Sequence, residues 1–439
     1  MIKDAVLSMI GSASFRLELK SLVAAVILFA PASVLLGFVT PYSVKLRTIS
    51  LADSGKTVGR LYALSTVGSI VGTFAAGFIL IPFVGSTRTL YLIAALLFGV
   101  SIILAPFAFT RANFAILTVF VFGAMGGEIS SYYMHRVSGL VDIDTQYSRV
   151  QIYNSRDEKT GREFRAIATD PFFAQSSMYL DDGSPVFEYV KYFDLINHFK
   201  PDHKNTLMIG GAGYTVPREY LKNNPEARID VVEIDPKMTE LAREYFNLKD
   251  DPRLTIFHED GRVYLNRSES AKYDAVFVDA FGSLFSIPYQ LTTVEAIRHI
   301  HRVLKNDGIV IVNIGSALTG PASKFLQAEY ATYKQVFPEV LLFKVRPERA
   351  DDELQNIVLI AINSPPAGEL ASELPSLSKE GWPPLWADGV VPDGVVMTNN
   401  RLLSNRYTGP IDPLKPLTDD LGPVEYYNSI ALPLYHNPK

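Results

Sequence analysis

The chain has 439 residues, a formal net charge of −5 and no cysteine. Its length exceeds that of one ordinary domain, and the lack of cysteine excludes disulfide bonds, thiol nucleophiles, iron–sulfur clusters and thiolate zinc sites. Charge is unevenly distributed along the chain. Residues 1–127 contain nine Lys and Arg and three Asp and Glu, whereas the remainder contains 32 Lys and Arg and 43 Asp and Glu. This asymmetry predicts a membrane region followed by an acidic globular part, whose charge argues against nucleic acid as a partner.

Residues 1–127 are predicted to form a helical transmembrane region. Four of its stretches carry no charged side chain, namely 21–44, 61–87, 89–110 and 112–127. The first three reach the roughly 20 residues that a span needs and the fourth is shorter, which gives three to four spans. Because the first three contain no Asp, Glu, Lys, Arg or His, ion-coupled transport is disfavoured, and anchoring or substrate access is expected. Lys and Arg in the flanking segments leave the orientation open.

Residues 128–200 are predicted to form a small β lobe and gate. Alternation of apolar and polar side chains over 148–153 and 164–167 favours two antiparallel strands separated by the polar stretch 154–162. At the other end, residues 364–439 are predicted to be an irregular extension. Its Pro- and Gly-rich stretch 364–394, with Trp382 and Trp386, is typical of a linker or lid.

Residues 201–363 alternate between strand and helix patterns, which indicates an α/β fold with a parallel sheet. Strands are expected at 206–209, 229–234, 254–257, 273–278 and 308–312, and a closing pair at 340–345 and 357–362. Helices are expected at 216–223, 236–246, 294–304 and 321–336. Thr292 and Glu295 have the spacing of a capping box for the third helix. The pattern predicts a Rossmann-type, class I methyltransferase-like sheet of seven strands.

Four motifs follow successive strands of this sheet. The first strand leads into Gly210-Gly211-Ala212-Gly213, and the second ends at Glu233, about 20 residues later, where a carboxylate accepts hydrogen bonds from ribose hydroxyls. The third is followed by Asp260-Gly261, where a carboxylate can accept a bond from an adenine amino group, and the fourth by Asp279. Ligands bind at this edge of open α/β sheets, so the four motifs together predict a nucleoside site.

The segment 207–312 resembles the spermidine synthase (polyamine aminopropyltransferase) family. The matching motifs are Gly210-Gly211-Ala212-Gly213 with Arg218-Glu219, Val232-Glu233-Ile234-Asp235, Asp260-Gly261, and Tyr273-Asp274-Ala275-Val276-Phe277-Val278-Asp279. The resemblance covers roughly residues 142–363. In addition, residues 58–63 and the tail motifs Leu417-Thr418-Asp419-Asp420 and Pro423-Val424-Glu425 are similar to membrane-fused spermidine synthase-like proteins.

The resemblance implies a transferase that uses decarboxylated S-adenosylmethionine to aminopropylate an amine or polyamine acceptor. It implies that Asp279 acts on the attacking amine, that Glu233 binds ribose and that Asp260 binds the adenine edge. It also implies substrate contacts from Gln175 and Glu188. A homodimer is the family's expectation, and the catalytic domain is placed in the cytoplasm, where the co-substrate is made.

Two further expectations concern the site directly. Tyr289 is expected near the predicted crevice, where it would contact substrate or pack in the core. A metal is not expected, because the seven histidines are scattered and the closest pair, His299 and His301, lies two residues apart, on different faces of a helix.

The sequence departs from the family's pattern where the acceptor and the aminopropyl group would bind. Gly213 and Gly282 stand where the family has aspartates, Ser148 where a Gln is usual, and Phe187 where a His or Gln is usual. Loss of a carboxylate removes charge-assisted hydrogen bonds to a cationic substrate, each worth roughly 1.5–3 kcal/mol. Two alternatives therefore stay open: a methyltransferase that uses intact S-adenosylmethionine on a membrane-accessible acceptor, or a nucleoside-binding module without turnover.

Overall fold

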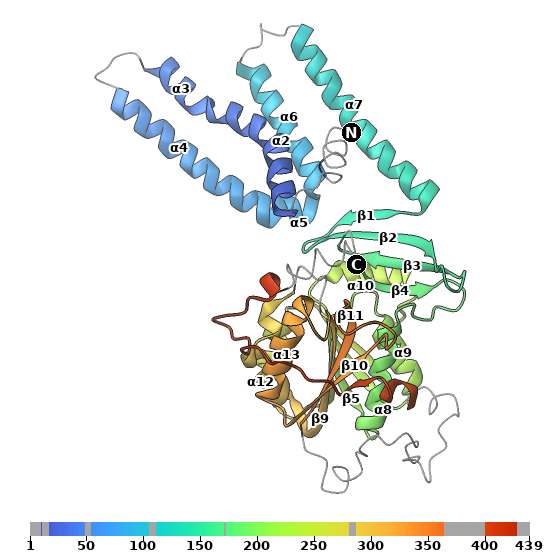
Figure 1. Cartoon of the computed structure of the whole chain (residues 1–439). Coiled ribbons are helices and arrows are strands. Elements are labelled where there is room, and N and C mark those ends of the chain that lie inside the picture. Colours follow the sequence, from blue (N-terminus) through green and yellow to red (C-terminus); the bar gives the residue numbers. More distant parts are fainter. Residues whose placement is uncertain are drawn as a thin grey trace. The chain divides into compact units, whose positions relative to one another are not determined.

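The computed structural model describes residue 10 and residues 17–48, 54–104, 111–170, 173–280, 287–363 and 400–427. Contacts divide the chain into two compact units, Met1–Ala94 and Ala95–Lys439. Among the described residues, the first unit contains only helices, and the second contains both β-sheets (Figure 1). The predicted linker and both tryptophans of the extension lie outside the described residues.

Long apolar helices make up most of the N-terminal part. They are α2 (Leu17–Gly37), α3 (Val39–Arg47), α4 (Ser54–Ala75), the π-helix η1 (Ala76–Leu80), α5 (Ile81–Val84), α6 (Ser86–Leu104) and α7 (Arg111–Ser138). Three of the described helical segments are long and apolar enough to cross a membrane: Leu19–Arg47, Ser54–Val84 and Ser86–Leu104. They correspond to the first three predicted spans, and the fourth predicted stretch lies within the longer helix α7.

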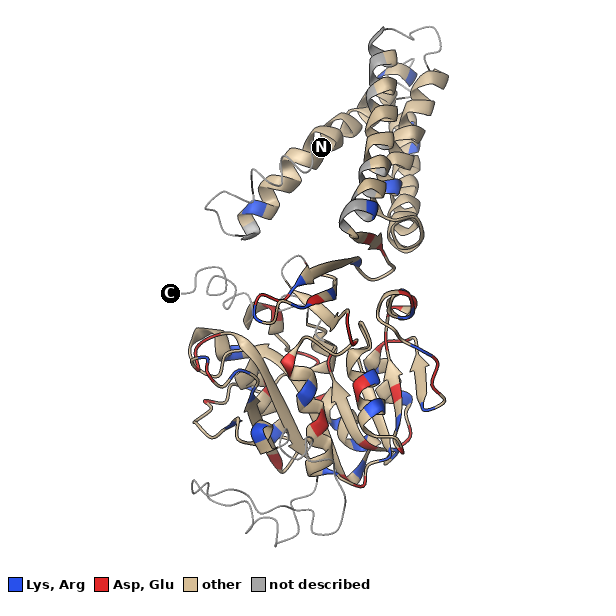
Figure 2. Cartoon of the chain, turned by 90° about the vertical axis from the view of Figure 1, so that its right-hand side faces the viewer, with Lys and Arg blue, Asp and Glu red and all other residues tan. Residues whose placement is uncertain are grey.

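Almost none of the residues in these three segments is buried, and many of their large apolar side chains are exposed. Figure 2 shows few charged residues along these helices, whereas both signs of charge are spread over the globular part. An apolar surface of this extent is typical of contact with lipid.

The β lobe is a four-stranded antiparallel sheet in the order β1-β2-β3-β4. The strands are β1 (Val141–Asp144), β2 (Arg149–Arg156), β3 (Glu163–Ala168) and β4 (Ala174–Tyr179). The two predicted strands correspond to β2 and β3. The flanking strands were not predicted, because β1 is short and acidic and β4 contains two buried polar residues, Ser176 and Ser177.

The large sheet has eight strands in the order β12-β10-β11-β9-β8-β5-β6-β7. They are β5 (Asn205–Ile209), β6 (Arg228–Val232), β7 (Leu254–Phe257), β8 (Tyr273–Val278), β9 (Leu304–Ser316), β10 (Glu339–Lys344), β11 (Gln355–Ile362) and β12 (Arg406–Tyr407). All seven predicted strands are present. The sheet also has an eighth strand, β12, so the predicted number of seven strands was too low. This strand lies within residues 364–439, which were predicted to be irregular. It has two residues and no apolar pattern, and it pairs with β10.

Helices cover both faces of the large sheet. They are η3 (Glu188–Leu195), α8 (Ile196–Phe199), α9 (Thr215–Asn223), α10 (Pro236–Tyr245), α11 (Gly261–Arg267), η4 (Tyr289–Leu291), α12 (Val294–Val303), η5 (Pro321–Ser323) and α13 (Lys324–Lys334). Alternate strand residues enter two separate cores: Phe277 packs with α9 and α10, and its neighbours Val276 and Val278 pack with α11, α12 and α13. Burial on both faces explains the continuous apolar runs seen in the sequence.

Two local predictions need correction. The cap of α12 is Thr293, whose hydroxyl accepts a hydrogen bond from the Ala296 amide at 3.3 Å, while Thr292 donates to the Tyr289 carbonyl. Glu295, the second residue of the predicted capping box, instead accepts a hydrogen bond from the Asp419 amide. The spacing of nearby residues cannot reveal this long-range contact. In addition, β9 begins at Leu304 rather than at residue 308, because Leu304 pairs with Tyr273 before a register shift.

The strand order places the site. Strands β5 and β8 are neighbours, but the chain continues from β5 towards β6 and β7 on one side and from β8 towards β9 on the other. This reversal at the carboxyl ends of parallel strands leaves a crevice in which open α/β sheets bind their ligands. The glycine loop after β5 and Asp279 after β8 therefore face the same crevice.

Candidate active site

A pocket of about 610 Å³ lies at this crevice and collects residues from both sheets of the globular unit. The β lobe contributes Tyr147, Ser148, Thr169, Asp170 and Gln175. The large sheet and its loops contribute Ile209, Gly210, Gly211, Ala212, Val232, Glu233, Ile234, Asp235, Met238, Asp260, Gly261, Asp279, Ala280, Ile287, Pro288, Gln290 and Leu291. The pocket thus unites residues that are far apart in the sequence, with carboxylates distributed around it.

The glycine loop is held by a buried carboxylate. The amides of Gly211 and Ala212 donate to Glu233 Oε2 at 2.9 and 3.0 Å, and the Asp235 amide donates to Oε1 at 3.0 Å. Two acceptor positions of Oε2 are thereby occupied, whereas Oε1 keeps one for a ligand. Glu233 therefore shapes the loop and can still accept one hydroxyl hydrogen bond.

Gly210 is required by the close approach of two strands. Its φ is +96°, and a Cβ atom there would lie 2.4 Å from the Asp279 carbonyl oxygen. Both the positive φ and the absence of space exclude a side chain. This contact brings the glycine loop directly against the residue that follows β8.

Asp260 offers a second acceptor to the pocket. Its Oδ1 accepts from the amides of Arg262 and Val263 at 2.8 and 3.0 Å and so caps helix α11. Its Oδ2 has a long contact of 3.4 Å with Gln290 Nε2. A ligand amino group can therefore bind Oδ2 without disturbing the cap.

Apolar side chains lie between these acceptors. Ile234, between the two acidic residues of the second strand end, is 38% exposed, and Ile287 and Leu291 line the pocket from the segment before α12. An apolar slot with carboxylate acceptors at its edges suits a flat heteroaromatic base joined to a sugar. The residues that line the pocket thus include apolar and acceptor side chains of the kinds that a nucleoside needs.

Asp279 is the ionisable group best suited to chemistry. Its Oδ2 accepts from the Tyr189 hydroxyl and its Oδ1 from Asn313 Nδ2, both at 3.0 Å. Burial raises the pKa of the Asp279 carboxyl to about 6, although the two hydrogen bonds lower it. Burial and the neighbouring Asp279 also raise the pKa of Tyr189, which remains a donor. A carboxyl with a pKa near 6 is a competent proton acceptor at neutral pH.

The orientation of Asn313 is fixed by a second amide. Asn356 Nδ2 donates to Asn313 Oδ1 at 3.0 Å, so the Asn313 Nδ2 group must face Asp279. Both asparagines lie on the paired strands β9 and β11. The sheet therefore positions a fixed donor beside the carboxylate.

The pocket contains seven of the ten predicted site residues. These are Asp279, Gly210, Gly211, Glu233, Asp260, Gly261 and Gln175. The other three are not among the lining residues. A Cβ atom on Gly213 would lie 2.7 Å from Ser176 Oγ, Glu188 is exposed at the start of η3, and the ring of Tyr289 lies against Gly422.

Tyr189, Asn313 and Ile234 were missed as site residues by sequence reasoning. Tyr189 directly follows Glu188, and in a 3₁₀-helix successive side chains diverge, so the tyrosine turns inward where the glutamate does not. Asn313 interrupts the apolar run 309–314 beside the Asp279 strand, and that interruption was an available signal. Ile234 was hidden because it looks like a core residue. Gly282 lies outside the described residues.

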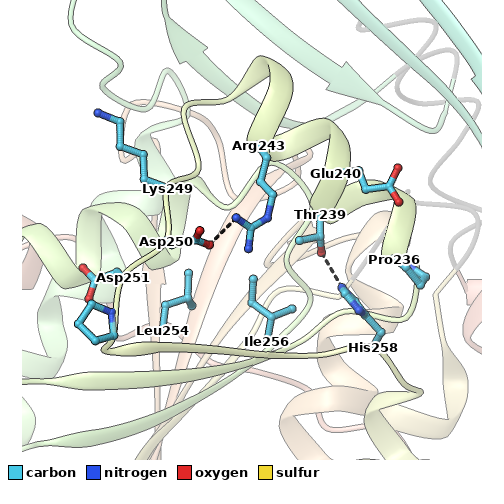
Figure 3. A pocket seen from close by; sticks show the side chains of 11 residues that line it. Pro236, Thr239, Glu240, Arg243, Lys249, Asp250, Asp251, Leu254, Ile256 and His258 are labelled. Atoms are coloured by element: carbon cyan, nitrogen blue, oxygen red, sulfur yellow. Dashed lines mark hydrogen bonds and ion pairs between the residues drawn. The ribbon is translucent and has the colours of Figure 1, made fainter.

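A second hollow, of about 760 Å³, lies at the edge strand β7 (Figure 3). It is lined by α10, β7 and the loop between them, with Thr239 bonded to His258 and Arg243 paired with Asp250. It includes neither the glycine loop nor Asp279. Within the described part of the chain, no group of three or more His, Asp or Glu could hold a metal ion.

Part of the chain is similar to known proteins. A family model described as "Spermine/spermidine synthase domain" matches residues 190–346. This part of the chain is therefore similar to spermine/spermidine synthase domains. The domain begins at Val190 in η3 and ends just past β10, so it includes the glycine loop, Glu233, Asp260 and Asp279 but not the β lobe.

Curated relatives of the synthase domain are named polyamine aminopropyltransferases. That of Vibrio vulnificus is 34% identical over 34% of this chain and 49% of its own length, and that of Clostridium acetobutylicum is 29% identical over 35% and 56%. A solved structure described as a probable spermidine synthase from Corynebacterium glutamicum is 24% identical, with a TM-score of 0.43, and covers 49% of this chain and 77% of its own. The chain spans about half the length of the curated relatives.

Proposed function

We propose that the protein is a membrane-anchored aminopropyltransferase, which moves the aminopropyl group of decarboxylated S-adenosylmethionine to an amine or polyamine acceptor. The observation that carries the proposal is the Asp279 carboxyl, which has a raised pKa and lies in a pocket shaped for a nucleoside. The names of the curated relatives support the same activity. In this proposal residues 128–200 cover the site as a lobe, and residues 201–363 bind the nucleoside.

The reaction needs little more than positioning and one proton acceptor. The amine nitrogen of the acceptor attacks the carbon next to the sulfonium, the C–N bond forms, and the C–S bond breaks with its electron pair staying on sulfur. Methylthioadenosine leaves as a neutral thioether, and Asp279 takes the proton that the attacking nitrogen loses. Since the sulfonium is already a good leaving group, alignment of the two reactants supplies most of the acceleration.

Each part of the co-substrate has a candidate partner in the pocket. Glu233 Oε1 would accept from a ribose hydroxyl, Asp260 Oδ2 would accept from the adenine amino group, and Ile234 would pack on the base. Gln175 lies on the β-lobe wall and would contact the acceptor. Glu188 and Tyr289 would contribute only if substrate binding moved their segments.

The proposal is tested by supplying the full-length protein in detergent with decarboxylated S-adenosylmethionine and a mixed pool of amines. Release of methylthioadenosine that requires both an amine and the wild-type chain is the expected result. If the protein binds the nucleoside saturably but releases no methylthioadenosine with any amine, the transferase proposal is wrong and the site only binds the nucleoside.

Gly213 favours methyl transfer as a second candidate. The space beside its Cα is occupied by Ser176, whose hydroxyl bonds to Thr215 at 2.8 Å, so a carboxylate at this position would require Ser176 to move. The site thus lacks one negative charge that would bind an aminopropyl ammonium and repel the carboxylate of intact S-adenosylmethionine. This second candidate predicts S-adenosylhomocysteine as the product.

We place the chain in a membrane as a multi-pass protein with the synthase domain in the cytoplasm, where its co-substrate is made. The three apolar helical segments support the membrane part of this proposal. Two subunits are proposed to form a dimer, on the family resemblance alone. Treatment of sealed vesicles with protease tests the orientation, because a cytoplasmic synthase domain is cleaved in inside-out vesicles and protected in right-side-out ones.

The pH profile should report the titration of Asp279. The value of kcat/KM for the sulfonium co-substrate, measured at saturating amine, is expected to rise with pH through about 6, since only the ionised carboxyl accepts the proton. Asn313→Ala removes a donor that lowers this pKa, so the inflection should move upward by about one pH unit.

A matched control for this measurement exists in the same domain. Asp194, which does not line the pocket, also has a pKa raised to about 6 by burial and accepts from Asn223 Nδ2 at 3.2 Å. Asn223→Ala should therefore leave the inflection of the rate unchanged. If the inflection moved in Asn223→Ala and not in Asn313→Ala, the pH profile would reflect the stability of the fold and not the titration of Asp279.

A further inference from the structure

The C-terminal tail is bound firmly to the domain although it lies outside the segment that matches the family model. The Val294 amide donates to the Leu417 carbonyl at 2.8 Å, and the Leu417 amide donates to the Thr332 hydroxyl at 3.0 Å. Leu417 and Val424 are both 1% exposed and belong to the core with α11, α12 and α13. The motif around Asp419 is thus held over the N-terminus of α12.

Asp419 connects this tail to a wall of the pocket through one arginine. Its Oδ2 pairs with Arg262 Nη2 at 2.8 Å, and its Oδ1 accepts from the Thr293 hydroxyl at 2.6 Å. Arg262 Nη1 in turn donates to the Gln290 carbonyl at 3.0 Å. Asp419 therefore fixes the arginine, and the arginine fixes Gln290.

Arg262 and Gln290 both contact Asp260, which lines the pocket. The Arg262 amide donates to Asp260 Oδ1, and Gln290 Nε2 faces Asp260 Oδ2. Asp260, Gly261, Gln290 and Leu291 all line the pocket. Gly422 completes the arrangement from the tail, since a Cβ atom on it would touch the Tyr289 ring at 3.4 Å. The tail thus supports the segment 287–291 from the side opposite to the pocket.

We propose that Asp419 is a positioning residue for nucleoside binding: through Arg262 it holds Gln290 and the Asp260 loop at the spacing that the adenine edge requires. The proposal rests on the proposed function of the pocket. It assigns a role to the tail motif that lies outside the synthase domain, and it makes the C-terminal segment part of the nucleoside site rather than an appendage. Asp419 does not line the pocket, so it acts through other residues.

The test is calorimetric titration of the full-length protein in detergent with 5′-methylthioadenosine, which contains the nucleoside but no transferable group. Asp419→Asn keeps the size of the side chain and removes its charge, and it should raise the Kd about three- to tenfold. Asp420→Asn is the matched control: Asp420 is exposed like Asp419, but the carboxylate that contacts Arg262 and Thr293 is that of Asp419, so this variant should leave the Kd unchanged. In the Arg262→Gln background, Asp419→Asn should add nothing further.

A kinetic comparison separates positioning from mere stability. For Asp419→Asn, KM for the sulfonium co-substrate should rise, while kcat and KM for the amine stay near the wild-type values. A fall in kcat with unchanged KM and Kd would mean that the tail only stabilises the fold, and would overturn the proposal. A wild-type chain that does not bind 5′-methylthioadenosine would instead overturn the proposed function, so the two failures are distinguishable.

Discussion

Asp279→Asn is expected to lower the rate of aminopropyl transfer by about 10²- to 10⁴-fold, which is the usual contribution of a positioned proton acceptor. The substitution keeps the shape of the side chain, and its amide can still accept from Asn313 and donate to Tyr189, so the pocket should stay intact. Binding of 5′-methylthioadenosine should therefore remain close to wild type. Single-turnover measurements at pH 7.5 separate the chemical step from binding and release.

The same variant is expected to be more stable than the wild type at neutral pH. The folded pKa of Asp279 is about 6 and its ordinary value is 3.8, so the folded state prefers the protonated form, and stability is lost as pH rises through this window. Above pH 6 the charge costs about 1–3 kcal/mol, allowing for water in the pocket. Urea unfolding should show the gain of Asp279→Asn at pH 7.5 and its loss near pH 4.

Asp194→Asn is the control for both effects. Its pKa is raised to the same value by burial, so the variant should also gain stability at neutral pH. Because Asp194 is not among the pocket residues, activity should be preserved. If Asp279→Asn behaved as Asp194→Asn does in activity, Asp279 would be a buried structural carboxylate and the proposed mechanism would be wrong.

Glu233→Gln is expected to weaken nucleoside binding about 10- to 100-fold, because the carboxylate supplies charge-assisted hydrogen bonds both to the loop and to the ligand. An amide has one oxygen, so it cannot accept from the amides of Gly211 and Ala212 and also from that of Asp235. One buried amide would lose its partner, which should lower the free energy of unfolding by about 1–3 kcal/mol.

Calorimetry and urea unfolding measure these two effects on the same sample. Glu240→Gln provides the comparison, since that glutamate is exposed and pairs with Lys237 one helical turn away. It should change neither the Kd for 5′-methylthioadenosine nor the stability by more than a few tenths of a kcal/mol. Wild-type affinity in Glu233→Gln would show that the ligand does not use this carboxylate and would remove the nucleoside assignment of the pocket.

Much of the candidate pocket could be predicted from the sequence, because its residues follow parallel strands whose carboxyl ends meet at one edge of the sheet. Gly210, Glu233 and Asp279 come directly after a recognisable apolar run, and Asp260 follows one after His258 and Glu259; the parallel sheet brings such positions to one edge. The alternation of strands and helices likewise predicted the seven strands that carry the site. Local patterns were sufficient here because the relevant geometry is set by the order of the elements.

The residues that support the site could not be predicted in the same way. Tyr189 reaches Asp279 across 90 positions, and Asp419 reaches Arg262 across 157, so no local spacing reveals either contact. The two-residue strand β12 and the polar strand β4 lack the apolar pattern on which strand prediction depends. Gly213 shows the opposite problem: its motif predicted a ligand contact, but the side chain of Ser176 fills the space beside it.

The most direct test of the central claim is the mass of the acceptor product when both donors are offered together. The protein would be incubated with equal amounts of decarboxylated and intact S-adenosylmethionine, an amine pool and a lipid extract. The masses of the acceptor products would then be measured by mass spectrometry. The account predicts an amine that has gained an aminopropyl group, with methylthioadenosine formed in equal amount. An acceptor that has gained a methyl group, with S-adenosylhomocysteine, would contradict it.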